Sequence, residues 1–103
     1  MDTHRKVRIE VIIESPLENR LIEVLDKLSV KGYTLIPAIA GRGHDGTWRR
    51  EGLVGGAGHM IVMLCIVDPS RSKEIVTQLY ELVGNQIGII NVSEVNVIRG
   101  EHF

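Results

Sequence analysis

The feature that most restricts the fold of this chain is an unbroken run of apolar residues, Met60–Val67. The run is far shorter than the roughly 20 residues of a membrane-spanning helix, and it is rich in strand-forming residues. It therefore predicts a strand that is buried on both faces. Helices cover only one face of the sheet in a small α+β domain, so the other face needs a cover. Self-association supplies it most simply, and a loop folded back over this face is the alternative.

The segment before this run predicts a strand, a helix and a second strand. Apolar and polar residues alternate over residues 7–13, as in a half-buried strand. Ser15 is the expected N-cap of an amphipathic helix, and Gly32 is the expected left-handed stop that follows it. A second strand is expected over residues 33–40. Pro37 lacks a backbone amide, which predicts an edge strand or a bulge there.

The second half repeats this pattern after a long glycine-rich segment at residues 41–58, which breaks every periodicity and predicts a loop. A helix is expected to begin at Asp68 and to end at Gly84, and a last strand to occupy residues 87–99. The order is thus βαβ, loop, βαβ. This order predicts a ferredoxin-like βαββαβ sandwich of the α+β class, with two helices on one face of a four-stranded antiparallel sheet.

Size and composition limit the function classes. The 103 residues fit one domain, residues 1–103, with 44% apolar and 24% charged residues. A net charge of −1 supplies no positive field for nucleic acid or an anionic membrane. Aromatic residues make up only 4% of the chain, and Met60–Val67 contains none. RNA-recognition domains of the same element order stack bases on sheet aromatics, so nucleic-acid binding is not expected.

The single cysteine and the first residues indicate the compartment. Cys65 cannot form an internal disulfide, which fits a reducing environment. The N-terminal residues lack the cleavage pattern of a secretory signal, and no apolar run is long enough to span a membrane. We therefore expect a cytoplasmic protein with no direct membrane insertion.

The start of the long loop is the candidate ligand site. Gly41 and Gly43 allow the backbone to approach a ligand closely and to present amides to an anion. Arg42 between them carries a planar donor fork that suits phosphate or carboxylate. This pattern also occurs in flexible loops without ligands, so on its own it leaves both interpretations open.

Metal and catalytic sites have little support in the sequence. The histidines have no metal-ligand spacing, and no serine stands in a nucleophile-elbow context. His44 and Asp45 are adjacent, so a catalytic trimer that acts on a phosphoester remains an alternative, as does a small trimeric divalent-metal-binding protein of the cation-tolerance type. We expect a non-enzyme with no cofactor and no bound metal. His59 either reaches an anion or is an exposed histidine at a strand start.

The sequence resembles a known family, the PII signalling proteins and their PII-like relatives. The resemblance lies in four segments in the family's order and spacing: residues 9–13, 41–43, 84–88 and 98–101. It implies a homotrimer with adenine-nucleotide sites between subunits. The T-loop, about residues 42–58, and the B-loop, about residues 84–88, would cover each site.

The resemblance also implies roles for particular residues. The nucleotide-binding residues would be Ile12, Gly41, Arg42, Gly43, His44, Asp45, Gly84, Asn85, Gln86, Ile87, Gly88 and Arg99. The residues near a small anion such as bicarbonate would be Arg42, His44 and His59. The T-loop residues that contact a partner protein would be Trp48, Arg49 and Arg50.

Departures from the family pattern indicate a subgroup. The usual B-loop lysine that holds the outer phosphates of ATP is missing, and Asp45 replaces a glutamine that helps to bind 2-oxoglutarate. The T-loop has no tyrosine to modify. These losses are similar to the carboxysome-associated PII-like proteins, which implies ADP or AMP and bicarbonate as ligands and a T-loop that contacts an unidentified transporter or enzyme. The alternative is a nitrogen-regulatory PII protein that binds ATP and 2-oxoglutarate.

Overall fold

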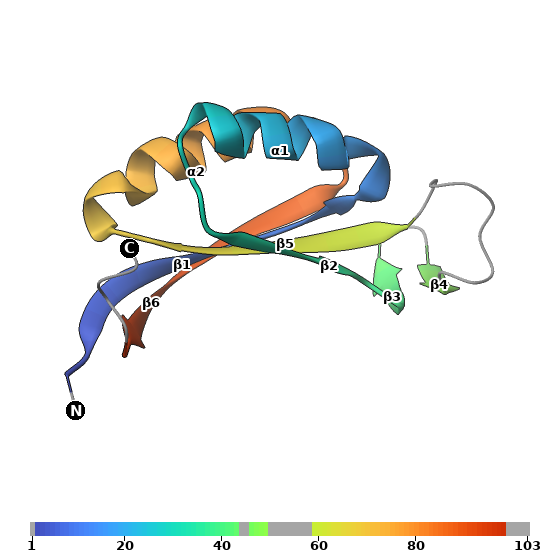
Figure 1. Cartoon of the computed structure of the whole chain (residues 1–103). Helices are drawn as coiled ribbons and strands as arrows, with labels where there is room; N and C mark the ends of the chain where they lie inside the picture. Colours follow the sequence, from blue (N-terminus) through green and yellow to red (C-terminus); the bar gives the residue numbers. More distant parts are fainter. Residues whose placement is uncertain (1, 44–45, 50–58, 99–103) are drawn as a thin grey trace.

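The computed structural model describes residues 2–43, 46–49 and 59–98 (Figure 1). Within these ranges the structure has two α-helices and six strands; the helices and four of the strands follow the predicted order, and a short 3-10 turn precedes the first helix. In chain order the elements are β1 (His4–Glu14), η1 (Ser15–Leu17), α1 (Glu18–Lys27), β2 (Tyr33–Pro37), β3 (Ala40–Gly43), β4 (Gly46–Arg49), β5 (Met60–Val67), α2 (Pro69–Val83) and β6 (Gly88–Val97).

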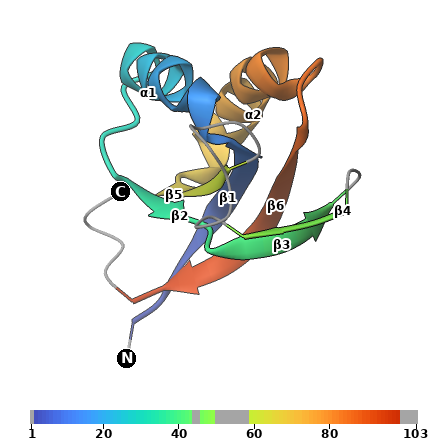
Figure 2. The ribbon, with the colours of Figure 1, turned by 90° about the vertical axis from the view of Figure 1, so that its right-hand side faces the viewer.

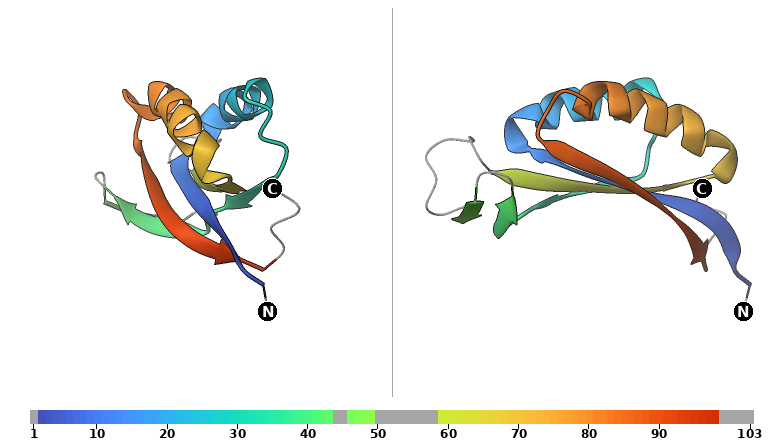
Figure 3. Two further views of the ribbon diagram at one scale, coloured as in Figure 1. Left: turned by 90° about the vertical axis from the view of Figure 1, so that its left-hand side faces the viewer. Right: turned by 180° about the vertical axis from the view of Figure 1, so that it is seen from behind.

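Four of the strands form one antiparallel sheet in the order β2-β5-β1-β6. Both helices lie on one face of this sheet, as the views in Figures 1 and 3 show. The predicted α+β ferredoxin-like sandwich is therefore confirmed. Strand β2 is an edge strand, as the missing amide of Pro37 predicts, but it ends at Pro37 and not at residue 40.

The core lies between the helices and the sheet. Every second residue of β1, from Val7 to Ile13, is buried against the helices. Leu21 and Leu25 of α1 and Ile75 and Leu79 of α2 are fully buried opposite them. The alternation and the helical spacing in the sequence therefore identify the faces that pack.

The central strand β5 departs from its prediction. Ile61, Met63, Cys65 and Val67 are buried, whereas the residues between them are only half-buried. The prediction of burial on both faces is therefore wrong for the single chain, because only one face of β5 lies under the helices. The other face, which we call the open face, carries the half-buried residues Met60, Val62, Leu64 and Ile66.

Several element ends also differ from the predictions. Ser15 begins the 3-10 turn instead of capping α1, which starts at Glu18 without a side-chain cap hydrogen bond. The left-handed residue after α1 is Ser29, with φ of 57°, and not Gly32. Gly84 is the C-cap of α2, as predicted. Strand β6 covers Gly88–Val97, so it is shorter than the predicted residues 87–99.

The segment predicted as a structureless loop contains a β-hairpin. Strands β3 and β4 form a separate two-stranded sheet in which Gly41 pairs with Trp48 and Arg42 with Thr47. Gly46 has φ of +100°, a conformation that favours glycine. The prediction missed the hairpin because glycines at alternate positions hide the period of a strand. Figure 2 shows this hairpin on the side of the sheet away from the helices. Neither helix in the described part of the chain is long and apolar enough to cross a membrane.

Candidate ligand-binding site

A pocket of about 640 Å³ lies between the β3–β4 hairpin and the adjoining end of the main sheet. Segments from both halves of the chain form its walls. Its lining consists of Ile12, Glu14, Ala38, Ala40, Gly41, Arg42, Gly43, Gly46, Thr47, Trp48, Met60, Val62, Ile87, Gly88 and Ile89.

The floor of the pocket is apolar and belongs to the open face of the sheet. Ile12 of β1 pairs with Val62 of β5 on one side and with Ile89 of β6 on the other. The three side chains share one face because strand residues alternate and the neighbouring Ile13 and Ile61 are buried on the helix side. An apolar floor of this kind suits the flat, weakly polar part of a ligand.

The hairpin supplies the second wall. In the pair formed by Gly41 and Trp48, the indole lies so close to the glycine that a Cβ there would be 3.1 Å from Trp48 Nε1. Gly41 therefore leaves room for the indole. Arg42 is exposed on the same hairpin, where its guanidinium is available to an anion.

The third wall is the start of β6. A Cβ on Gly88 would lie 2.6 Å from the carbonyl oxygen of Ile12 and 2.9 Å from Cγ2 of Ile13. Only glycine lets β6 begin this close to β1. Ile87 and Gly88 line the pocket, whereas Gly84, Asn85 and Gln86 of the same turn do not. The amide of Gly84 instead donates to the carbonyl of Tyr80, and that of Gln86 donates to the carbonyl of Val83.

Two charged residues line the pocket in the described part of the chain, Arg42 and Glu14. Sequence reasoning missed Glu14. Strand alternation carried the signal, since Glu14 lies two residues after Ile12 and so shares its face. The opposite charges at the rim limit the positive field that the described residues present to a highly charged ligand.

The structure brings together seven of the residues selected from the sequence: Ile12, Gly41, Arg42, Gly43, Trp48, Ile87 and Gly88. His59 does not line the pocket; its carbonyl accepts a hydrogen bond of 2.8 Å from the amide of Ser15. Arg49 is exposed at the end of β4, outside the pocket lining. The remaining predicted residues, His44, Asp45, Arg50 and Arg99, lie outside the described residues.

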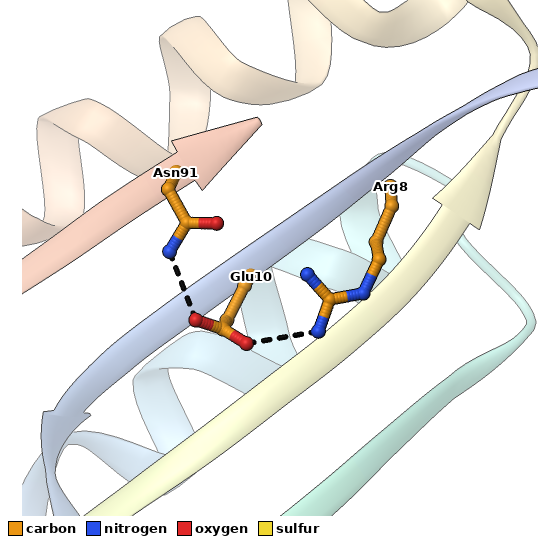
Figure 4. Close-up of polar contacts among 3 residues, drawn as sticks. All are labelled: Arg8, Glu10 and Asn91. Carbon is orange, nitrogen blue, oxygen red and sulfur yellow. Dashed lines mark hydrogen bonds and ion pairs between the residues drawn. The ribbon is translucent and has the colours of Figure 1, made fainter. Parts of the chain in front are cut away.

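A polar cluster borders the pocket floor on the open face (Figure 4). Asn91 Nδ2 donates to Glu10 Oε1 at 2.9 Å, and Arg8 donates to Glu10 Oε2 at 2.9 Å. These hydrogen bonds, first that from Asn91 and then that from Arg8, lower the pKa of Glu10. Glu10 lies two residues from Ile12 on β1, and it pairs with Asn91 of β6 and Leu64 of β5.

Among residues 2–43, 46–49 and 59–98, no three His, Cys, Asp or Glu residues are grouped so that they could hold a metal ion. Cys65 is buried, and burial raises the pKa of its thiol to about 11. A thiol with so high a pKa is a poor nucleophile at neutral pH.

These features define a class of site. Glycine backbone, one arginine and an apolar floor form a pocket for a small molecule with a flat apolar part and an anionic part. The chain matches the family described as nitrogen regulatory protein P-II over residues 6–102, and it therefore belongs to this family. The predicted resemblance to PII-like proteins is confirmed.

Solved structures agree with this assignment. A PII-like signalling protein from Thermus thermophilus shares 33% sequence identity, with a TM-score of 0.80 over 100% of this chain and 99% of that chain. CPII, a nitrogen regulatory PII-like protein from Thiomonas intermedia K12 bound to ADP, AMP and bicarbonate, shares 20% identity. Its TM-score is 0.86 over 99% of this chain and 96% of that chain. A comparison with curated proteins gave no match.

Proposed function

We propose that this PII-like signalling protein binds ADP or AMP in the pocket and bicarbonate beside it. The observation that carries the proposal is the convergence of three distant segments on one pocket: Ile12 of β1, the hairpin around Arg42, and Gly88 of β6. The family resemblance assigns nucleotide binding to all three. CPII, which has the same fold, was solved with ADP, AMP and bicarbonate, and this supports the same ligands here.

The pocket offers a different contact for each part of a nucleotide. The floor of Ile12, Val62 and Ile89 suits an adenine ring, which stacks well on apolar side chains. Arg42 suits the phosphates, and the glycine amides beside it add donors for oxygen atoms. The absence of the family lysine from the B-loop favours ADP or AMP over ATP. The roles of His44, Asp45, Arg99 and His59 stay predictions.

We further propose that the functional unit is a homotrimer. On the open face, Ile36 pairs with Val62, which extends the pocket floor into an apolar row across all four strands. Ile36 and Ile89 at the two ends of this row are 41% and 56% exposed in the single chain. Burial of such a row between subunits stabilises an assembly, and it supplies the cover that the apolar run of β5 requires.

Signalling in this proposal is a population shift. The hairpin lies at the base of the T-loop, so a ligand bound against Arg42 stabilises one arrangement of the loop over others. The loop then contacts a transporter or an enzyme; of the three predicted contacts, Trp48 lines the pocket, and Arg49 and Arg50 stay predictions. The carboxysome link, the cytoplasmic location and the absence of catalysis belong to this proposal as well.

A ligand screen by thermal shift tests this function. At 100 times the Kd, a ligand stabilises the folded state by about 2.7 kcal/mol, which raises the Tm of a domain of this size by roughly 10 to 20 °C. We expect ADP and AMP to raise the Tm, and bicarbonate to increase the effect of ADP. ATP with 2-oxoglutarate, or zinc and copper alone, should have less effect. A Tm that rises with metal ions alone would favour the cation-tolerance alternative.

Two arginines of the same hairpin provide a matched pair of variants. Arg42→Ala should weaken ADP binding by about 1.5 to 3 kcal/mol, the range for hydrogen bonds to charged groups. Arg49→Ala removes the same charge from outside the pocket lining and should leave ADP affinity unchanged. Equal losses in the two variants would indicate a general charge effect and would contradict the role of Arg42.

A further inference from the structure

Trp48 occupies a position that the sequence did not indicate. It was predicted to contact a partner protein, but its half-buried side chain lines the pocket. The indole packs on Gly41, where Nε1, Cε2 and Cζ2 would lie 3.1 to 3.4 Å from an added Cβ. A side chain on the facing residue would displace the indole from this position. The hairpin register and a glycine thus fix an aromatic ring at the wall of the pocket.

The other walls of the pocket are suited to hold a flat ring against this indole. Ile12, Val62 and Ile89 form an apolar floor on the sheet, and the indole belongs to the separate hairpin sheet. A pocket with an aromatic side chain on one wall and aliphatic side chains on another excludes water from a flat ring placed in it. Indole faces bind nucleobases by stacking, and every base offers a face to stack.

We infer that Trp48 is a base-binding residue, which stacks on the adenine ring of the bound nucleotide. This inference rests on the proposed function, and it extends it by assigning the recognition of the base to the hairpin. Arg42 then binds the phosphates of the nucleotide, and the indole of Trp48 binds its base. Arg42 pairs with Thr47 and Trp48 pairs with Gly41, so the two residues take adjacent register positions of the same short β-ribbon.

The assignment also gives Gly41 a role distinct from close approach to phosphate. A Cβ at Gly41 would lie 3.1 Å from Nε1 of Trp48, so a side chain there requires the indole to shift from its place in the pocket. The single tryptophan of the chain makes this testable by fluorescence, since all indole emission comes from Trp48.

The experiment compares Trp48→Leu with Trp48→Phe in the full-length protein, with AMP as the ligand. Leucine keeps an apolar side chain against Gly41 but removes the aromatic face, whereas phenylalanine keeps a face. Calorimetry should give a loss of AMP affinity of between about fivefold and about 150-fold for Trp48→Leu, the range for removal of one stacked base. Trp48→Phe should bind AMP with an affinity within about threefold of that of the unmodified protein, because an aromatic face is kept. AMP should also quench the emission of Trp48 in the unmodified protein.

The outcomes separate this inference from the proposed function. The inference is overturned if the unmodified protein binds AMP without a change in tryptophan emission and Trp48→Leu binds AMP with the same affinity. The indole then does not contact the base, although nucleotide binding itself stands. If the unmodified protein binds no adenine nucleotide, the proposed function fails and the inference fails with it. Circular dichroism of both variants confirms that the fold is retained.

Discussion

Gly88 is the position where one added methyl group tests the architecture of the site most sharply. It begins β6, pairs with Ile13 of β1 and lines the pocket. A Cβ there would lie 2.6 Å from the carbonyl oxygen of Ile12, 2.9 Å from Cγ2 of Ile13 and 3.2 Å from Cγ1 of Val83. Side chains can rotate to relieve two of these contacts, but the carbonyl oxygen belongs to a paired strand and can move only with β1.

The loss of stability expected for Gly88→Ala follows from these contacts. An extra methyl group in a tightly packed region costs about 1 to 3 kcal/mol, and Gly88→Ala should fall in the upper half of this range because one clash is with backbone. In a domain of about 100 residues each kcal/mol lowers the Tm by about 4 to 8 °C. We therefore expect the Tm to fall by roughly 8 to 24 °C. Nucleotide affinity should fall too, because Ile12 is displaced from the pocket floor.

Thermal unfolding at one fixed protein concentration measures this effect, since oligomerisation makes the Tm depend on concentration. Gly32→Ala is the matched control: it adds the same methyl group where no atom lies within 4 Å. This control should leave stability unchanged or raise it by up to about 1 kcal/mol. If Gly88→Ala and Gly32→Ala unfold at the same temperature, the close approach of β6 to β1, and with it this wall of the pocket, is refuted.

Asn91→Ala should raise the pKa of Glu10, which carboxyl NMR measures. The lowered pKa of Glu10 stabilises the folded state at pH values above 4.5, and this stabilisation is lost as the pH falls through the lowered pKa. The variant should therefore lose less stability than the unmodified protein when the pH is lowered. An unchanged titration would contradict the cluster. Cys65 should react slowly with iodoacetamide at neutral pH until urea unfolds the chain, because burial raises its pKa to about 11; rapid labelling of the folded protein would contradict its burial. Asp68→Asn should lower the free energy of unfolding by about 1 to 3 kcal/mol, since it leaves the buried Lys6 ammonium without a carboxylate. Unchanged stability would show that this ion pair is not formed.

The main fold was predictable because local patterns determine it. Alternation in β1 and helical spacing in α1 and α2 identify the buried faces without any tertiary information. The left-handed residue after α1 was not predictable, because Ser29 adopts φ of 57° against the usual preference for glycine. The next residue, Val30, is buried in the core and its amide donates to the carbonyl of Leu25, and these contacts outweigh the propensity of one residue.

The candidate site was predictable in its glycines and its arginine but not in its walls. Glycines at positions 41, 43 and 46 conceal the hairpin, since a strand pattern depends on side chains that these residues lack. The contact between Gly41 and Trp48 depends on the hairpin register; the face of Glu14 follows from strand alternation, but its place in the lining depends on where the hairpin lies against β1. Both are tertiary properties. The apolar run of β5 predicts self-association from the sequence alone, and its open face stays only half-buried in the single chain.

The most direct test of the central claim is a calorimetric titration of the unmodified protein with ADP, in the absence and in the presence of bicarbonate. We expect saturable binding of ADP, with one site for each chain and a higher affinity when bicarbonate is present. The absence of any heat of binding, with the protein shown to be folded by circular dichroism, would contradict the assignment of the pocket to adenine nucleotides.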